Sequence, residues 1–192
     1  MIKLPSHFLD QMSYVCHCFW MATEAFDQKL AGLRELAREI GSHEDWWLFP
    51  TQEPIQGFMG TGQIFIVGDQ PSTDEWGPKH PNRKIFYERL HKAGLQNAHL
   101  TDLYKRRDFA GALERLIPDD FLEHVNLFKK EIQILKPTLI VGLGQLAQRL
   151  LIQNLPDWKP MIPRIYHFAH VERVGMTSGQ YETNMRKIIL GE

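Results

Sequence analysis

Residues 64–72 carry the clearest structural signal in the chain, and they read Ile64-Phe65-Ile66-Val67-Gly68-Asp69-Gln70-Pro71-Ser72. The four apolar residues at the start are typical of a buried β-strand. Gly68 allows the chain to turn sharply out of that strand, and Pro71 makes the loop after it rigid. Ligands of open α/β sheets bind beyond the carboxyl ends of the strands. The segment therefore predicts a strand of a parallel sheet that ends in a ligand-binding loop.

Three further runs, at residues 98–105, 138–144 and 163–170, are also strand-like and end in polar groups. Helical periodicity fills the segments between them. The clearest case begins after Pro118 and two aspartates and ends at Pro137, with its apolar stripe at Phe121, Val125, Phe128, Ile132 and Leu135. Other helices are expected over residues 7–40 and 83–93, after Gly144, and after about Ser178.

This alternation of strands and helices predicts right-handed crossovers and a parallel sheet covered on both faces. We expect an α/β protein, a three-layer α/β/α sandwich with a four-stranded parallel sheet and extra N-terminal helices. The length of 192 residues fits a single domain. Within it, we expect an N-terminal helical part at residues 1–60 and the parallel-sheet core at residues 61–192.

The composition is that of an ordinary soluble protein, with 43% hydrophobic and 23% charged residues. No apolar run approaches the ~18 residues that a membrane span requires, and the first residues lack a signal-peptide pattern. We therefore expect a cytoplasmic protein that does not contact membranes. The net charge of −1 argues against a protein coated in basic residues for indiscriminate nucleic-acid binding. Local basic clusters do follow two of the strands, at residues 79–84 and 105–107.

The order of four short motifs resembles the uracil-DNA glycosylase superfamily over roughly residues 63 to 190. These motifs are a G-x-x-P loop at residues 68–71, a T-N-x-x-K-like segment at 101–105, an L-K-P-x-x-I-V-x-L-G-x-x-A unit at 135–147, and His167 in an H-P-S-like position. The resemblance implies a monomeric DNA glycosylase that hydrolyses the N-glycosidic bond of a flipped-out deaminated or damaged base. Its partner would be single- or double-stranded DNA, with no cofactor and no metal. The alternative is a catalytically inactive member that binds nucleic acid or a nucleotide.

The resemblance also implies two catalytic residues. Asp69 occupies the loop position from which an acidic side chain stabilises the cationic sugar, with Asp74 or Glu75 in reserve. Gln70, at the next position, can orient a water molecule but cannot accept its proton at neutral pH. His167 aligns with the histidine that donates to the departing base, although His170 could supply that imidazole instead. Substrate-binding roles are expected for Gly68, Gln70, Pro71, Ser72, Thr101, Asp102 and His170.

Asp102 stands where the family has a base-reading asparagine. An ionised aspartate only accepts hydrogen bonds, so uracil should be read poorly. Either the preferred base differs, or the carboxyl group is protonated in a dry pocket, or Asp102 pairs with Lys105 or Arg106. Phe168 and Ala169 replace the proline and serine that usually follow the family's histidine.

Several other patterns have weaker functional interpretations. Residues 142–147 fit the dinucleotide-binding G-x-G-x-x-A pattern but follow the third strand and lack the later acid. The two cysteines, in Cys16-His17-Cys18, have the wrong spacing for zinc and are too few for the iron–sulfur cluster of several related families. Trp76, Phe86 or His80 could stack on a base, whereas the aromatic residues at 46–49 are expected to close the core.

Overall fold

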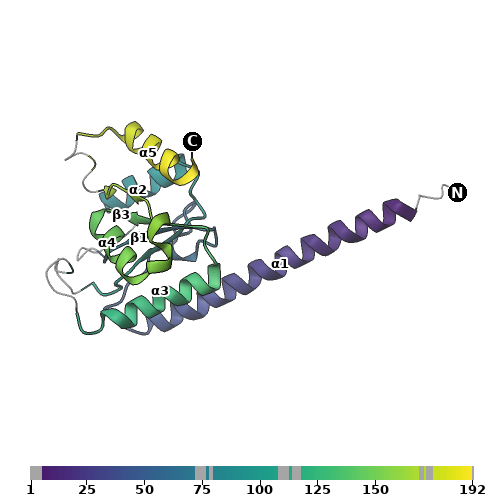
Figure 1. Ribbon diagram of the computed structural model, residues 1–192, viewed down its shortest axis with the longest axis horizontal. Coiled ribbons are helices and arrows are strands. Elements are labelled where there is room, and N and C mark those ends of the chain that lie inside the picture. Colours follow the sequence, from purple (N-terminus) through teal and green to yellow (C-terminus); the bar gives the residue numbers. More distant parts are fainter. Residues whose placement is uncertain are drawn as a thin grey trace.

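The computed structural model of this protein describes residues 6–71, 77, 80–107, 113, 118–168, 171 and 175–191, and it describes the backbone alone for residues 6–23. A four-stranded parallel sheet lies at the centre of the fold, with the strand order β2-β1-β3-β4 (Figure 1). Its strands are β1 (Ile64–Gly68), β2 (His99–Asp102), β3 (Leu139–Leu143) and β4 (Arg164–Ile165).

Helices cover both faces of the sheet, as the alternation of elements predicted. The α-helices are α1 (Ser6–Gly41), α2 (Pro81–Lys92), α3 (Phe121–Leu135), α4 (Gln145–Asn154) and α5 (Ser178–Leu190). Short 3-10 helices occur at η1 (Gly57–Met59) and η2 (Pro156–Met161). One hydrophobic cluster joins the sheet to α1, α3 and α4, and a second joins it to α2 and α5. The protein is therefore a three-layer α/β/α sandwich.

Helix α3 has the bounds that its sequence predicted. It begins directly after Asp120 and ends before Lys136, which adopts a left-handed conformation with φ 51°. Pro137 follows, and proline disfavours a helical conformation in the residue before it. Phe121, Val125, Phe128 and Leu135 are all buried against the sheet.

Two strands are shorter than predicted. The run at residues 98–105 leaves the sheet after Asp102, although Leu103 still donates a backbone hydrogen bond to Gly68 at the end of β1, and Tyr104 to Asp69. The run at residues 163–170 contributes only two residues, because the chain then turns under α5, where the hydroxyl of Tyr181 donates to the carbonyl of Tyr166 at 2.8 Å. On α5, Ile189 is buried, whereas Ile188 is exposed.

The glycine pattern at residues 142–147 has a packing explanation. A side chain at Gly142 would lie 2.8 Å from the Cα of Gln148, so glycine allows α4 to pack closely on β3. Gly144 has a φ of 99°, a conformation that favours glycine, at the turn from β3 into α4. These requirements explain both glycines without a dinucleotide.

The strand order places a crevice at one edge of the sheet. From β1, the chain crosses to β2 on one side, whereas β3 and β4 lie on the other side. The loops after β1 and β3 therefore lead away in opposite directions, which opens a crevice between the carboxyl ends of these two neighbouring strands. This topology makes the loop at residues 68–71 a candidate ligand-binding loop.

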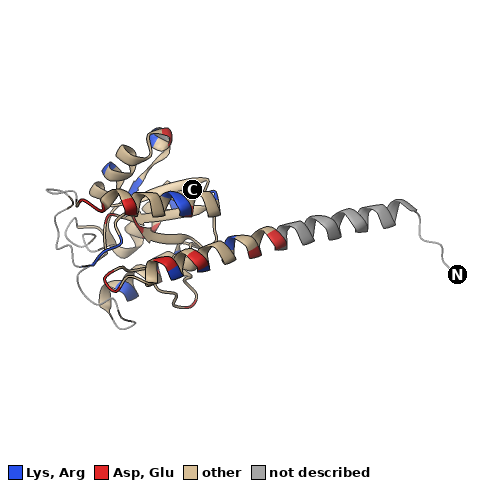
Figure 2. Ribbon diagram, turned by 90° about the horizontal axis from the view of Figure 1, so that it is seen from below, with Lys and Arg blue, Asp and Glu red and all other residues tan. Residues whose placement is uncertain are grey.

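Acidic and basic residues are interspersed along α1 and the neighbouring helices in the view of Figure 2. Within the part of the chain that the structure describes, no helix has the combined length and apolar character that a membrane crossing needs.

Candidate functional site

A cavity of about 120 Å³ lies at the carboxyl ends of β1, β2 and β3. It brings together six of the residues that the sequence placed in the site: Gly68, Asp69, Gln70, Pro71, Asp102 and His167. The other lining residues are Trp47, Phe49, Asn82, Leu143 and Phe168. The predicted convergence of the strand ends is thus present in the structure.

A wider groove of about 490 Å³ adjoins this cavity. Cavity and groove share Asp69, Gln70, Pro71, Leu143 and His167. The groove then continues over the start of α4, where it is lined by Gly144, Gln145, Leu146, Arg164 and Tyr166. Asp69 and His167 therefore lie where the smaller cavity meets the larger groove.

Aromatic rings form much of the cavity wall. The rings of Trp47 and Phe49 meet edge to face with centroids 4.8 Å apart. His167 stacks on Phe168 at 4.3 Å, and Phe168 stacks on the buried ring of Phe86 at 4.7 Å. The aromatic residues at positions 46–49 were expected to close the core. Phe49 and Trp47 do pack in the hydrophobic cluster with α2 and α5, and both also line the cavity.

The loop after β1 is held by the segment after β2. The backbone N–H of Leu103 donates to the carbonyl of Gly68 at 2.9 Å, and that of Tyr104 donates to the carbonyl of Asp69 at 3.0 Å. A side chain at residue 68 would collide with Oδ1 of Asp102. Glycine is therefore needed at this position for the Asp102 carboxyl group to lie beside the strand end.

Asp102 is buried, with 4% of its surface exposed, and its Oδ2 has no hydrogen-bond partner among the described residues. Burial raises the pKa of this carboxyl group well above its usual value, and the nearby charge of Asp69 raises it further. Lys105 acts in the opposite direction without reversing the shift. The structure therefore favours a neutral Asp102 side chain.

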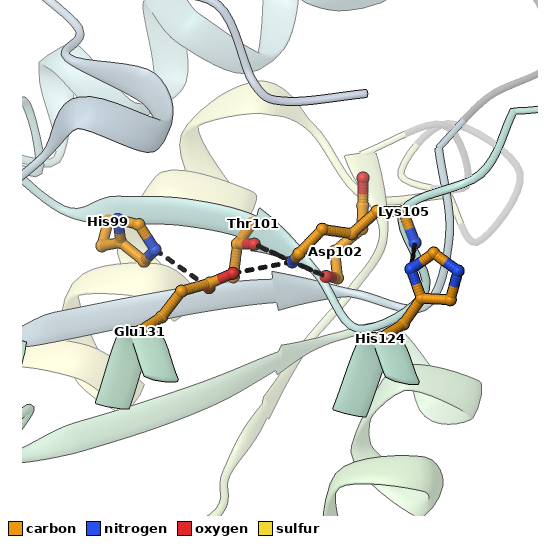
Figure 3. Close-up of polar contacts among 6 residues, drawn as sticks. All are labelled: His99, Thr101, Asp102, Lys105, His124 and Glu131. Atoms are coloured by element: carbon orange, nitrogen blue, oxygen red, sulfur yellow. Dashed lines mark hydrogen bonds and ion pairs between the residues drawn. The ribbon is translucent and has the colours of Figure 1, made fainter. Parts of the chain in front are cut away.

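A buried polar network lies behind Asp102 (Figure 3). The Lys105 ammonium donates to the hydroxyl of Thr101 at 2.9 Å and to the backbone carbonyl of Asp102 at 2.8 Å. Its third partner is Oε1 of Glu131, also at 2.8 Å. Since an ammonium group has three N–H donors, these contacts use all of them.

Glu131 completes the network from α3. Its Oε2 lies 3.1 Å from Nε2 of His99, and the side chains of Lys105, Glu131 and His99 are all fully buried. Burial alone would raise the pKa of Glu131, but the charge of Lys105 and the hydrogen bond from His99 outweigh it and lower the pKa. The carboxylate is therefore ionised and accepts from both neighbours.

This network corrects two expectations. Thr101 does not line the cavity, because its hydroxyl faces Lys105 inside the protein. Lys105 contacts the backbone carbonyl of Asp102 and forms its ion pair with Glu131, while Arg106 forms ion pairs with Asp45 and Asp120. The pairing of the Asp102 carboxyl group with Lys105 or Arg106 is thus not found, and Lys105 is too buried to bind a phosphate.

Other candidates are placed less favourably or cannot be placed. Phe86 lies fully inside the core, where it supports Phe168 and cannot itself stack on a base. The predicted residues Ser72 and His170 lie outside the described residues, as do Asp74, Glu75 and Trp76 and the side chains of residues 16–18. Among the side chains that the structure does describe, no group of three or more His, Cys, Asp or Glu residues could hold a metal ion.

Comparison of the chain with protein-family models and with curated proteins gave no match.

The sequence contained a signal for the buried network. Glu131 and His124 interrupt the apolar side of α3, and both side chains are fully buried. A charged residue on the inner side of a helix requires a partner, because an unpaired buried charge is costly. Lys105, at the end of the second strand-like run, is a cation that could supply this partner.

The first prediction concerns the ion pair. Lys105→Met should lower the free energy of unfolding by ~3–5 kcal/mol, because it leaves Glu131 buried and unpaired. Adding Glu131→Gln should recover much of this loss, since the amide still accepts from His99. Urea unfolding measures both effects.

The exposed pair of Lys130 and Glu39, 2.7 Å apart against 2.8 Å for the buried pair, provides a matched control. Lys130→Met should cost less than ~1 kcal/mol because water screens an exposed pair. Equal costs for Lys130→Met and Lys105→Met would contradict a dependence of the fold on the buried pair.

The second prediction concerns the pH dependence of stability. Because folding raises the pKa of Asp102 above the unfolded value of 3.8, its contribution to stability is full at acidic pH and is lost as pH rises. Asp102→Asn should therefore become increasingly stable relative to wild type as pH rises above about 4. Thermal unfolding at several pH values measures this difference.

Asp120 supplies a control of opposite sign. Its pKa is lowered, because hydrogen bonds from Arg106 and Tyr104 outweigh the effect of burial. Asp120→Asn should lose stability relative to wild type as pH rises toward the unfolded value of 3.8, and this difference should stay constant above about pH 5. Parallel pH profiles for the two variants would show that Asp102 ionises normally in the folded protein.

Proposed function

We propose that this protein is a DNA glycosylase-like hydrolase that takes a flipped-out, deaminated or damaged base into the cavity and hydrolyses its N-glycosidic bond. The convergence of Asp69, Asp102 and His167 between aromatic walls supports this proposal most strongly. Enzymes that act on a base extrude it into a close-fitting pocket, where they stack on it and hydrogen-bond its edge. The cavity offers both kinds of contact.

The size of the cavity fits a single ring. A volume of about 120 Å³ equals that of about four water molecules at ~30 Å³ each. This space suits a six-membered heterocycle with its exocyclic groups, while a sugar and its phosphates need the adjoining groove. Asp69 and His167, which line both spaces, would then flank the bond between base and sugar.

These positions define a role for each side chain. The carboxylate of Asp69 would stabilise positive charge on the sugar as the bond to the base breaks, and Gln70 would orient the attacking water. His167 would donate to an oxygen of the departing base, which leaves with the bonding electron pair. Water adds its oxygen to the sugar, and its proton is released.

The groove provides a place for the DNA backbone. It passes the N-terminus of α4, where free N–H groups and the helix dipole favour anions, and it contains the exposed side chain of Arg164. The guanidinium of Arg164 lies 5.8 Å from the ring of Tyr166. A phosphate next to the flipped nucleotide would meet both features.

The third prediction tests the reaction. Purified protein should release base from oligonucleotides that carry uracil, hypoxanthine or xanthine, as detected by alkaline cleavage at the abasic site. Asp69→Asn and His167→Ala should each reduce the rate by about a hundredfold or more, because each removes a charge-stabilising group. Gln70→Ala should reduce it less.

Full activity in Asp69→Asn would show that another acidic residue stabilises the sugar. Full activity in His167→Ala would show that His167 does not donate to the departing base. If no oligonucleotide is cleaved but all are bound in a salt-dependent way, the alternative holds, and the protein is an inactive nucleic-acid-binding member of this fold. Gln70, which cannot act as a base, is the residue that favours this alternative.

The fourth prediction concerns the groove. Arg164→Gln should weaken oligonucleotide binding and reduce the slope of log affinity against log salt by about one. Lys130→Gln, remote from the groove on α3, should leave the slope unchanged. A salt slope that is the same in wild type and both variants would remove Arg164 from the DNA-binding surface.

A further inference from the structure

The carboxyl group of Asp102 is the strongest unexplained polar feature of the cavity. It lines the cavity, only 4% of the residue is exposed, and Oδ2 has no partner among the described residues. A buried polar atom without a partner costs free energy unless a ligand supplies the missing hydrogen bond. Asp102 is therefore placed to bind a ligand.

Among the residues that the structure describes, no cation pairs with this carboxyl group. Lys105 is the closest candidate, but its three donors are already committed to Thr101, the backbone carbonyl of Asp102 and Glu131. The positive charge of Lys105 is also balanced by the negative charge of Glu131 within the same buried network. The network thus fixes the backbone of Asp102 and leaves its side chain uncompensated.

A negative charge within the cavity itself raises the pKa of Asp102, and Arg83 and His167 each contact an aromatic ring. Asp69, from the loop after β1, shares the cavity and repels a second negative charge. From α2, the guanidinium of Arg83 lies 5.4 Å from the ring of Tyr87, whose own pKa is raised mainly by burial and partly by Asp102. His167, after β4, shares the cavity and stacks on Phe168.

We infer that Asp102 binds its ligand as a neutral carboxylic acid, which donates a hydrogen bond through one oxygen and accepts one through the other. This inference rests on the proposed function, in that the ligand is a base held in the cavity. A neutral carboxyl group has the same pair of donor and acceptor as an asparagine amide. The complementary ligand therefore presents an N–H group beside a carbonyl oxygen, as the lactam edge of uracil does.

The inference selects the protonated carboxyl group from the three alternatives that the sequence left open for Asp102. An ionised Asp102 would repel the carbonyl oxygen of uracil, and Asp102→Asn would then improve uracil binding. A neutral Asp102 binds uracil about as well as asparagine does, so the same substitution changes little. The two accounts differ in a measurable quantity.

The test uses the full chain and two measurements. Carboxyl-carbon NMR reports the protonation of Asp102, whose signal is assigned by its absence in Asp102→Asn. Equilibrium binding then compares uracil with N3-methyluracil, which lacks the N–H donor, for wild type, Asp102→Asn and Asp102→Ala. Thermal unfolding confirms that each variant is folded.

We expect a neutral carboxyl signal at about pH 7. Uracil should bind wild type and Asp102→Asn within about threefold of each other, and Asp102→Ala about tenfold more weakly. N3-methyluracil should bind wild type about tenfold more weakly than uracil does. This comparison uses the wild-type protein alone, so it does not depend on the folding of a variant.

An ionised signal at that pH, a gain of about tenfold in uracil affinity with Asp102→Asn, or equal binding of the two ligands by wild type would overturn the inference. The absence of uracil binding to every form would overturn it as well. Binding as expected without cleavage of any oligonucleotide would leave the inference standing and refute the proposed hydrolysis. Cleavage by a protein with an ionised Asp102 would support the proposed hydrolysis and refute the inference.

Discussion

The ammonium of Lys105, buried inside the protein with three acceptors around it, is the interaction on which the site depends. It joins the end of β2 to α3, because two of its acceptors belong to Thr101 and Asp102 and the third to Glu131. An ion pair that is fully removed from water tolerates little change in geometry, since either charge alone would be strongly unfavourable. The backbone of Asp102 is therefore held in place by the core, and its side chain is left for the cavity.

The topology of the sheet supplies the second constraint. The order β2-β1-β3-β4 opens a crevice between the ends of β1 and β3, and the loop at residues 68–71 lies in it. Two carboxyl groups in this crevice have different surroundings. Asp102 is buried and lines only the cavity, whereas Asp69 lines both the cavity and the groove. Such a difference allows one acid to remain neutral while the other carries charge, which is how paired carboxyl groups acquire separate roles.

Much of the fold was predictable from local sequence signals. Apolar runs located the four strands, Pro118 and Pro137 bounded α3, and the rule that parallel strands end at one edge brought Asp69, Asp102 and His167 together. The burial of Lys105 was harder to predict, because three consecutive basic residues usually indicate surface, and only the charged residue on the inner side of α3 indicated a buried cation. The cavity-lining role of Trp47 and Phe49 was not predicted, because aromatic residues in the core and in a cavity wall have the same sequence pattern. Only their position in the folded protein distinguishes the two.

Amide NMR during titration with a single-stranded oligonucleotide carrying one uracil tests the central claim most directly, since it shows where the ligand lies without requiring chemistry. The account predicts that the largest shift changes occur at Gly68, Asp69, Asp102 and His167, with smaller changes along the groove at Gln145 and Arg164. Changes confined to a different surface, such as the hollow lined by Phe26, Leu30 and Met59, would contradict it, and so would the absence of any change.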